Sequence, residues 1–179
     1  MDNIFTESSR LIFRRMSEAD FSDLAEMLKN PNVMYAWEYV FDDVDVLSWI
    51  KKNREYYKKY GLGYFLAVDK SSLQVVGQIA LMPDIIEGIE YYEIGYILKE
   101  KFWHKGYALE GAKAMINYAF NNLKLKSVIF EIRPENIRSR KVAEKCGAFV
   151  TGEFVKNVRG KNMKHLIYTL NKSYSNPSG

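Results

Sequence analysis

The sequence predicts a single α+β domain in which a mixed, mostly antiparallel central sheet is flanked by helices. Its 179 residues are the usual size of one domain, and 47% hydrophobic with 27% charged residues is an ordinary globular balance. Segments that alternate apolar and polar residues are interspersed with segments of helical spacing. Short turns join most of the strand segments and a helix joins one pair, which predicts antiparallel hairpins and one parallel crossover.

The N-terminal part is predicted to contain one strand and two helices. Residues 11–14 (Leu-Ile-Phe-Arg) form the first strand segment. Residues 17–20 have the pattern of a capping box, and apolar residues follow at helical spacing over 21–28. A second helix is predicted over about residues 44–60, because Gly61 is a suitable C-terminal stop.

The rest of the chain is predicted to form strands and two further helices. Residues 69–72 indicate a turn, residues 83–90 a loop, and residues 159–162 (Arg-Gly-Lys-Asn) a hairpin turn. The domain is expected to span 1–170, followed by a flexible tail over 171–179. The expected strands are 64–68, 75–81, 91–98, 127–132, 149–158 and 163–170, and the expected helices are about 106–120 and 136–145.

Composition excludes several classes of protein. One Cys and two His, without ligand spacing, predict no metal site, and the lone Cys146 fits a reducing compartment, so we expect a cytoplasmic protein. The first ten residues lack the pattern of a signal peptide, and no apolar run approaches the roughly 20 residues of a membrane span. The net charge of +4 is spread among charges of both signs, which makes nucleic acid an unlikely partner.

The segment with the clearest chemical meaning is the boundary between the strand 91–98 and the following helix. The first N–H groups of a helix have no internal partners and carry the positive end of the helix dipole, so they suit a phosphate or pyrophosphate. Gly106 and Ala108 are small enough for the main chain to approach such an anion, and Lys105 adds positive charge. The alternative is that Gly106 only eases the loop into the helix.

Two motifs in this chain resemble those of the GNAT acetyltransferases. The run 102–111 (Phe-Trp-His-Lys-Gly-Tyr-Ala-Leu-Glu-Gly) is similar to the family's acetyl-CoA loop, with Trp103, Gly106 and Ala108 at its three pattern positions. The run 136–149 resembles the family's Asn-x-x-Ser segment and the Glu-Lys-x-Gly-Phe that follows it. The Trp form of the loop and the preceding Glu-Ile-Gly-Tyr-Ile-Leu are similar to the branch of Rim-type ribosomal-protein N-terminal acetyltransferases.

The resemblance, which covers about residues 9–170, implies a GNAT-like fold and acetyl-CoA as the acetyl donor. It implies that the main chain of Ile97 and Leu98 pairs with the pantetheine arm, and that Asn136 and Ser139 contact the pantetheine side of the cofactor. It also implies that the pyrophosphate is held mainly by main-chain N–H groups of His104, Lys105, Gly106, Tyr107, Ala108 and Leu109.

Acetyl transfer to an amine requires a neutral nitrogen and therefore a base. Glu93, on the strand beside the expected thioester, is the candidate, and the alternative is a surface-facing strand residue. An α-amine has a reference pKa of about 7.7–8 and a lysine side chain about 10.4, so the α-amine needs less help. Many GNAT enzymes have a Tyr at position 143 as the general acid, but Ala143 stands there, which leaves Ser139 or unassisted departure of the thiolate.

These motifs predict direct transfer from acetyl-CoA to an amine, first a protein or peptide α-amine and then a small amine. A non-catalytic acyl-CoA-binding module and a nucleic-acid binder are the rivals, and a monomer and a homodimer are both open. We expect no chemistry at Cys146 or His165. The aromatic residues of 35–41 are expected either in the core or at the acceptor site. A solvated face is expected for the basic hairpin, which we define as Lys156, Arg159, Lys161 and Lys164.

Overall fold

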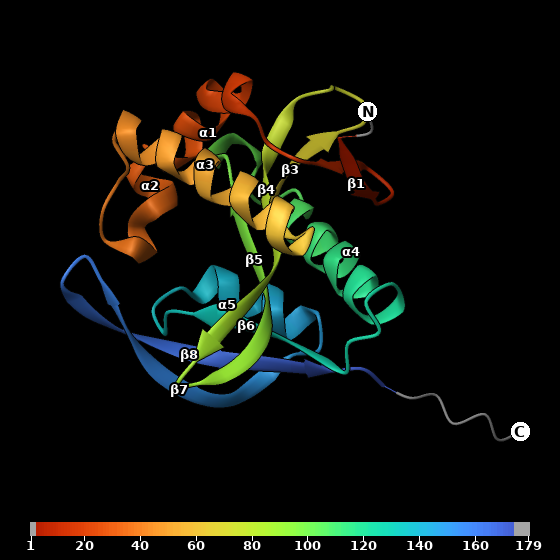
Figure 1. The fold of residues 1–179 in the computed structure, drawn as a ribbon, viewed down its shortest axis with the longest axis vertical. Coiled ribbons are helices and arrows are strands. Elements are labelled where there is room, and N and C mark those ends of the chain that lie inside the picture. The colour runs from red at the N-terminus through yellow and green to blue at the C-terminus, as the bar shows by residue number, and fades with distance from the viewer. Residues whose placement is uncertain (1–2, 174–179) are drawn as a thin grey trace, which may run out of the picture.

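A computed structural model describes residues 3–173, and an eight-stranded sheet forms the centre of the molecule (Figure 1). The strand order is β1-β2-β3-β4-β5-β6-β8-β7. The strands are β1 (Ile4–Glu7), β2 (Leu11–Arg14), β3 (Gly63–Asp69), β4 (Val75–Ile86), β5 (Ile89–Leu98), β6 (Ser127–Ile132), β7 (Phe149–Val158) and β8 (Lys161–Asn171). The helices are α1 (Phe21–Leu28), α2 (Pro31–Met34), α3 (Asp43–Tyr60), α4 (Tyr107–Asn121) and α5 (Ile137–Lys145).

All neighbouring strands pair antiparallel except β5 and β6, which are parallel and joined through α4. The predicted fold class is therefore confirmed, but the expectation of a single crossover is wrong: β6 also continues through α5 to β7, which runs parallel to it on the far side of β8. The β5–β6 pair is unusual because its only matched register position is Glu93 opposite Ile129. Beyond that position towards Leu98, the two strands separate.

The sheet has a different apolar core on each face. On one face, Ala112 and Met115 of α4 and Ala143 of α5 pack against strand residues such as Ile79 and Ile94. The opposite face carries α1, α2 and α3, which pack on a second set of strand residues that includes Tyr64, Ala80 and Ile97. Because side chains alternate along a strand, Ile94 and its i+2 neighbours on β5 face α4, whereas Glu93 and Ile97 face α3.

The helix boundaries follow from local signals. The predicted capping box at Ser17 and Asp20 is present and opens the 3₁₀ turn that leads into α1. Helix α3 begins one residue before the predicted position, because Asp42 caps it and Asp45 returns the hydrogen bond. Gly61 ends α3 with a φ of +70°, as predicted. None of the helices in residues 3–173 is long and apolar enough to cross a membrane.

The predicted loop over 83–90 is wrong, because β4 continues to Ile86 and β5 begins at Ile89. Pro83 is tolerated there since the pairing of β4 with β3 ends at Leu81, which leaves one side of β4 without a partner strand. The turn contains only Glu87 and Gly88, both in the left-handed region at φ +51° and +83°, as two-residue hairpins require.

Four smaller differences concern the ends of the chain, the segment before α3 and the β7–β8 turn. The structure contains β1 and the short helix α2, neither of which was predicted. Strand β8 extends to Asn171, which was assigned to the tail, and residues 174–179 of that predicted tail lie outside the described residues. The predicted turn at 159–162 is shorter than expected, because Lys161 and Asn162 already belong to β8.

Candidate active site

The separation of β5 from β6 interrupts the strand pairing in the middle of the sheet, and we call this break the gap. The predicted donor-binding residues lie on the segments around it. Leu98 ends β5 on one side of the gap, α4 begins shortly after it, and Asn136 and Ser139 lie at the start of α5 on the other side. Figure 1 shows β5 running between α4 and α5. The sheet therefore brings together segments that are up to 42 positions apart in the sequence, from Ile97 to Ser139.

The main-chain groups of β5 differ in which side they face. The Lys99 N–H donates to Val76 O in β4, and the N–H groups of an antiparallel strand alternate sides. By this alternation the main chain of Leu98 faces the gap, and that of Ile97 faces β4. Tyr96, rather than Ile97, is therefore the second residue whose main chain a ligand in the gap would meet. The Leu98 carbonyl already accepts a bond from the Trp103 indole, 3.2 Å away, which leaves its N–H available.

Helix α4 begins with the geometry of an anion site. Gly106 is its N-cap at φ +79°, His104 is also left-handed at φ +60°, and no side chain caps the helix. Within residues 3–173, no hydrogen bond is donated by the main-chain N–H groups of residues 104–109. They lie at the positive end of a helix of 15 residues, so a phosphate group placed there would satisfy them.

Arg10 holds the turn at the start of α4 in place. Its guanidinium donates to Glu110 Oε2 at 2.6 Å and to Lys105 O at 3.0 Å, and it lies 4.5 Å from the centre of the Tyr107 ring. Glu110 also accepts from the main-chain N–H of Arg10 at 2.7 Å. These contacts use the carbonyl side of the loop and leave its N–H groups unused.

Residues of α5 complete the far side of the gap. Asn136 caps α5 by accepting from the Ser139 N–H, and the same oxygen accepts from the Tyr35 hydroxyl at 2.8 Å. The Tyr96 hydroxyl crosses the gap and donates to Ser139 O at 2.7 Å. Among the described residues, the Ser139 hydroxyl takes part in no hydrogen bond. Ala143, where many enzymes with this loop have a tyrosine, is fully buried.

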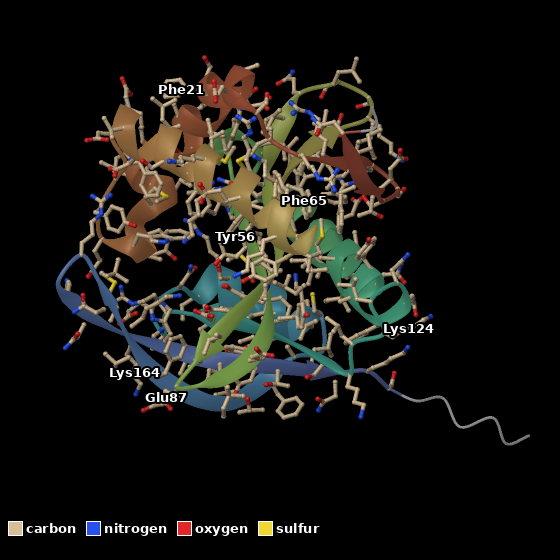
Figure 2. The ribbon with its side chains drawn as sticks, viewed as in Figure 1. Phe21, Tyr56, Phe65, Glu87, Lys124 and Lys164 are labelled. Carbon is tan, nitrogen blue, oxygen red and sulfur yellow. The ribbon has the colours of Figure 1, made fainter. Side chains whose placement is uncertain are left out.

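Glu93 lies on the opposite face of β5, in a cluster of carboxylates. Oxygens of Asp84, Glu93 and Glu131 all lie within 4.8 Å of one another. Lys156 Nζ is 2.9 Å from Glu131 and 3.9 Å from Asp84. We call these four residues the carboxylate cluster. On the α3 side lie Lys52 and Tyr56, and Figure 2 shows Tyr56 between α3 and the β4–β5 hairpin.

Burial dominates the electrostatics of the carboxylate cluster. It raises the pKa of Glu93, an effect that Lys156 opposes and the charge of Asp84 increases. Burial also raises the pKa of Glu131, with further contributions from the charge of Glu93 and from the proximity of Asp84. For Asp84, burial is outweighed by its interactions with Glu131, the Ile85 N–H and Lys156, so its pKa is lowered. A carboxylate with a raised pKa is a stronger base.

Other residues that the sequence singled out have structural roles. Burial raises the pKa of the Cys146 thiol to about 11, which makes it a poor nucleophile. His165 Nδ1 bonds to Met163 O at 3.0 Å, and burial lowers its pKa. Of the aromatic segment, Phe41 belongs to the core, whereas Tyr35 is 44% exposed and faces Asn136.

Each residue of the basic hairpin has an acidic partner within the chain. Arg159 pairs with Asp45 at 2.8 Å and lies 3.9 Å from the centre of the Tyr39 ring, and Lys161 pairs with Glu38. Lys156 and Lys164 pair with Glu131 and Glu153. The tip of the β7–β8 hairpin is thereby attached to the first turn of α3 and to the segment before it, and its charge is largely compensated.

Sequence reasoning missed four residues of this region: Tyr96, Asp84, Glu131 and Lys156. Alternation along β5 carried a signal for Tyr96, because it puts residues 96 and 98 on the gap side of the strand. No comparable signal existed for the carboxylate cluster. Asp84 was assigned to a loop, and Glu131 meets it only because the β4–β5 hairpin packs over β6, where Ile86 contacts Ile129.

Comparisons with known proteins agree with this geometry. Residues 10–148 match the family model of the acetyltransferase (GNAT) domain. The uncharacterized N-acetyltransferase YnaD of Bacillus subtilis is 31% identical over 83% of this chain and 85% of its own. A GNAT-family acetyltransferase structure from Bacillus anthracis superposes with a TM-score of 0.79 at 28% identity, covering 94% of this chain and 98% of its own. A ribosomal-protein-S5-alanine acetyltransferase from Vibrio fischeri shares the fold, with a TM-score of 0.73, 20% identity, and coverage of 93% and 95%.

Proposed function

Because this chain belongs to the GNAT acetyltransferase family, whose members use acetyl-CoA, we propose that it transfers the acetyl group directly to an amine with Glu93 as the base. The observation that carries the proposal is the position of Glu93. It lies where β5 and β6 separate, on the face opposite α4, so a donor in the gap and an acceptor on the α3 side would meet beside it.

The donor side follows from the unused hydrogen-bond donors. We assign the pyrophosphate to the N–H groups of residues 104–109, where the helix dipole adds to the attraction. The pantetheine arm then lies along β5 in the gap and pairs with the main chain of Tyr96 and Leu98, between that strand and the start of α5. An N–H group of this strand is placed to polarise the thioester carbonyl.

The acceptor side requires the amine to lose its proton. A carboxylate whose pKa burial raises is matched to amines of low pKa, and a peptide α-amine, near ~7.7–8, is closer than a lysine side chain near ~10.4. A peptide α-amine is therefore the first proposed acceptor, followed by a small amine. On the donor side, we propose that the Ser139 hydroxyl donates a hydrogen bond to the departing thiolate and keeps its own proton, because a thiol is a much stronger acid than a serine hydroxyl. We place this reaction in the cytoplasm, consistent with the single free cysteine.

Turnover of Glu93→Gln tests this proposal. Loss of a general base lowers turnover by about 10²–10⁴-fold, whereas the affinity for acetyl-CoA should stay the same because Glu93 lies on the other face of β5. Acetyl-CoA consumption is measured with a peptide α-amine, an Nα-blocked lysine peptide and a small diamine. A fully active Glu93→Gln protein would remove Glu93 from the mechanism. Acetyl-CoA binding without consumption by any amine would favour the non-catalytic module.

A further inference from the structure

The Glu131 side chain is less solvent-accessible than those of Asp84 and Lys156. It is 3% exposed, compared with 30% for Asp84. Glu131 Oε2 accepts from Lys156 at 2.9 Å, but Oε1 is buried without a hydrogen-bond partner in the described part of the chain. A buried oxygen without a partner is costly, and the Glu131 carboxylate has an oxygen within 4.8 Å of oxygens of two further carboxylates.

A proton on Glu131 Oε1 would give this unpartnered oxygen a hydrogen-bonding role and remove one of the three negative charges. The protonated oxygen becomes a donor and Asp84 becomes its acceptor, so both residues gain a hydrogen bond. The Glu131 oxygen that faces Lys156 still accepts from the ammonium group. Three ionised carboxylates would otherwise share a single close lysine, and like charges this near one another favour retention of a proton.

We propose that Glu131 is a positioning residue for acetyl transfer: it keeps a proton that it donates to Asp84, and Glu93 remains the carboxylate that accepts the proton of the acceptor amine. This inference rests on the proposed function for the role of Glu93, although the protonation state of Glu131 does not depend on it. The directions of the pKa shifts agree, since the pKa is lowered for Asp84 and raised for Glu131.

The groups that face the cluster come from every element packed around it. With Glu131 neutral, the ionised Asp84 and Glu93 and the ammonium of Lys156 leave one net negative charge within the carboxylate cluster, and Lys52 faces it from α3. The titratable and charged residues around the cluster are Asp84 on β4, Glu93 on β5, Glu131 on β6, Lys156 on β7, His165 on β8 beside Lys156, Tyr64 on β3, and Lys52 and Tyr56 on α3.

The direct test is a carboxyl NMR titration of the protein labelled with ¹³C at the glutamate side chains. The Glu131 signal is assigned by its loss in Glu131→Gln. We expect this carboxyl carbon to keep the chemical shift of a protonated acid at pH 7 in the wild-type protein. A chemical shift typical of a carboxylate at pH 7 would overturn the proposal. This measurement needs no turnover, so it stands even if Glu93→Gln is fully active and the proposed base fails.

The second readout is the pH profile of kcat/KM. The amide of Glu131→Gln is uncharged, like the protonated acid, so the acid-side pKa of the profile should move by less than about half a pH unit, whatever the change in kcat. An ionised Glu131 within 4.8 Å would raise that pKa by roughly 2.5 units at an effective dielectric constant of about 20. A fall of that size in Glu131→Gln would contradict the proposal.

Glu153→Gln is the matched control for both readouts. It removes a carboxylate from β7, but this side chain is 59% exposed and pairs with Lys164 outside the cluster. We expect it to leave the Glu131 signal and the acid-side pKa in place. Movement of either in the control would show that the readout follows the general charge of the protein, which would overturn the inference drawn from Glu131→Gln.

Discussion

The proposed pyrophosphate site can be tested by changing Gly106 to Ala. Gly106 has a φ of +79°, which a residue with a Cβ adopts at a cost of about 1–2 kcal/mol. The added methyl carbon itself meets little resistance, since its nearest neighbour is Arg10 Nη2 at 3.4 Å, the end of a flexible side chain. The backbone strain is therefore the main effect, and it acts where the N–H groups of residues 104–109 converge.

The chain contains a matched control for this strain. Gly160, at the tip of the β7–β8 hairpin, has a φ of +81°, and no atom lies within 4 Å of its hypothetical Cβ. Both substitutions should lower the melting temperature by roughly 2–8 °C, because each kcal/mol is worth about 2–4 °C in a chain of this size. Gly160→Ala should not change the affinity for acetyl-CoA, because the hairpin tip lies on the α3 side.

Gly106→Ala should lower the affinity as well. If the loop relaxes towards negative φ, its N–H groups turn away from the phosphate. Each lost hydrogen bond to a charged group is worth about 1.5–3 kcal/mol, which corresponds to a roughly 10- to 100-fold higher Kd. Isothermal titration calorimetry with acetyl-CoA gives this value directly. Equal affinities in the two variants would refute the assignment of the pyrophosphate to this turn.

Three further predictions concern ligand binding and charge. Acetyl-CoA at 100 times its Kd should stabilise the folded protein by about 2.7 kcal/mol, which is a rise of roughly 5–11 °C in a thermal melt, and no rise at millimolar concentration would count against binding. Lys156→Met removes the charge that lowers the pKa of Glu93, so the acid limb of the kcat/KM profile should move up by about one pH unit, and movement to lower pH would contradict the cluster electrostatics. The Asp20 pKa is lowered because hydrogen bonds from Arg14 and Ser17 outweigh its burial, so the stabilisation is present above the unfolded pKa of about 3.9 and is lost as the pH falls below it. Asp20→Asn should lower the free energy of unfolding by about 2–3 kcal/mol at pH 6, less than for a fully buried pair because Arg14 is 27% exposed. The variant's free energy of unfolding, measured by urea titration, should also depend less on pH. An unchanged pH dependence would show that the Arg14–Asp20 pair is unimportant.

The sequence was informative wherever local signals decide the structure. The start of α4 was predictable because Gly106 and the helical spacing after it lie within a few positions of each other. The hairpin at Arg159 and Gly160 and the end of α3 at Gly61 were predictable for the same reason. The loop at 83–90 was predicted wrongly because Pro83 and Gly88 are turn residues in most contexts. A proline is acceptable at that position of β4 because β3 begins only at Gly63, opposite Leu81, so Pro83 has no partner strand on that side.

The candidate site was predictable in its donor half and not in its acceptor half. The predicted donor residues follow one another along the chain or belong to a motif, so the linear pattern retains them. The members of the carboxylate cluster come from four strands, β4, β5, β6 and β7. They meet only because the β4–β5 hairpin packs over β6. Which main-chain groups face the gap also depends on strand register, which is why Tyr96 had to be read from the pairing of β5 with β4.

The single paired register position between β5 and β6 has a mechanical consequence. Glu93 and Ile129 sit at the vertex of the wedge that these strands form, and a vertex is the point that moves least when a wedge opens. If the two strands spread to admit a long donor molecule, the smallest displacement is expected at Glu93. The proposed base would then keep its place beside the acceptor while the donor exchanges on the other side of the sheet.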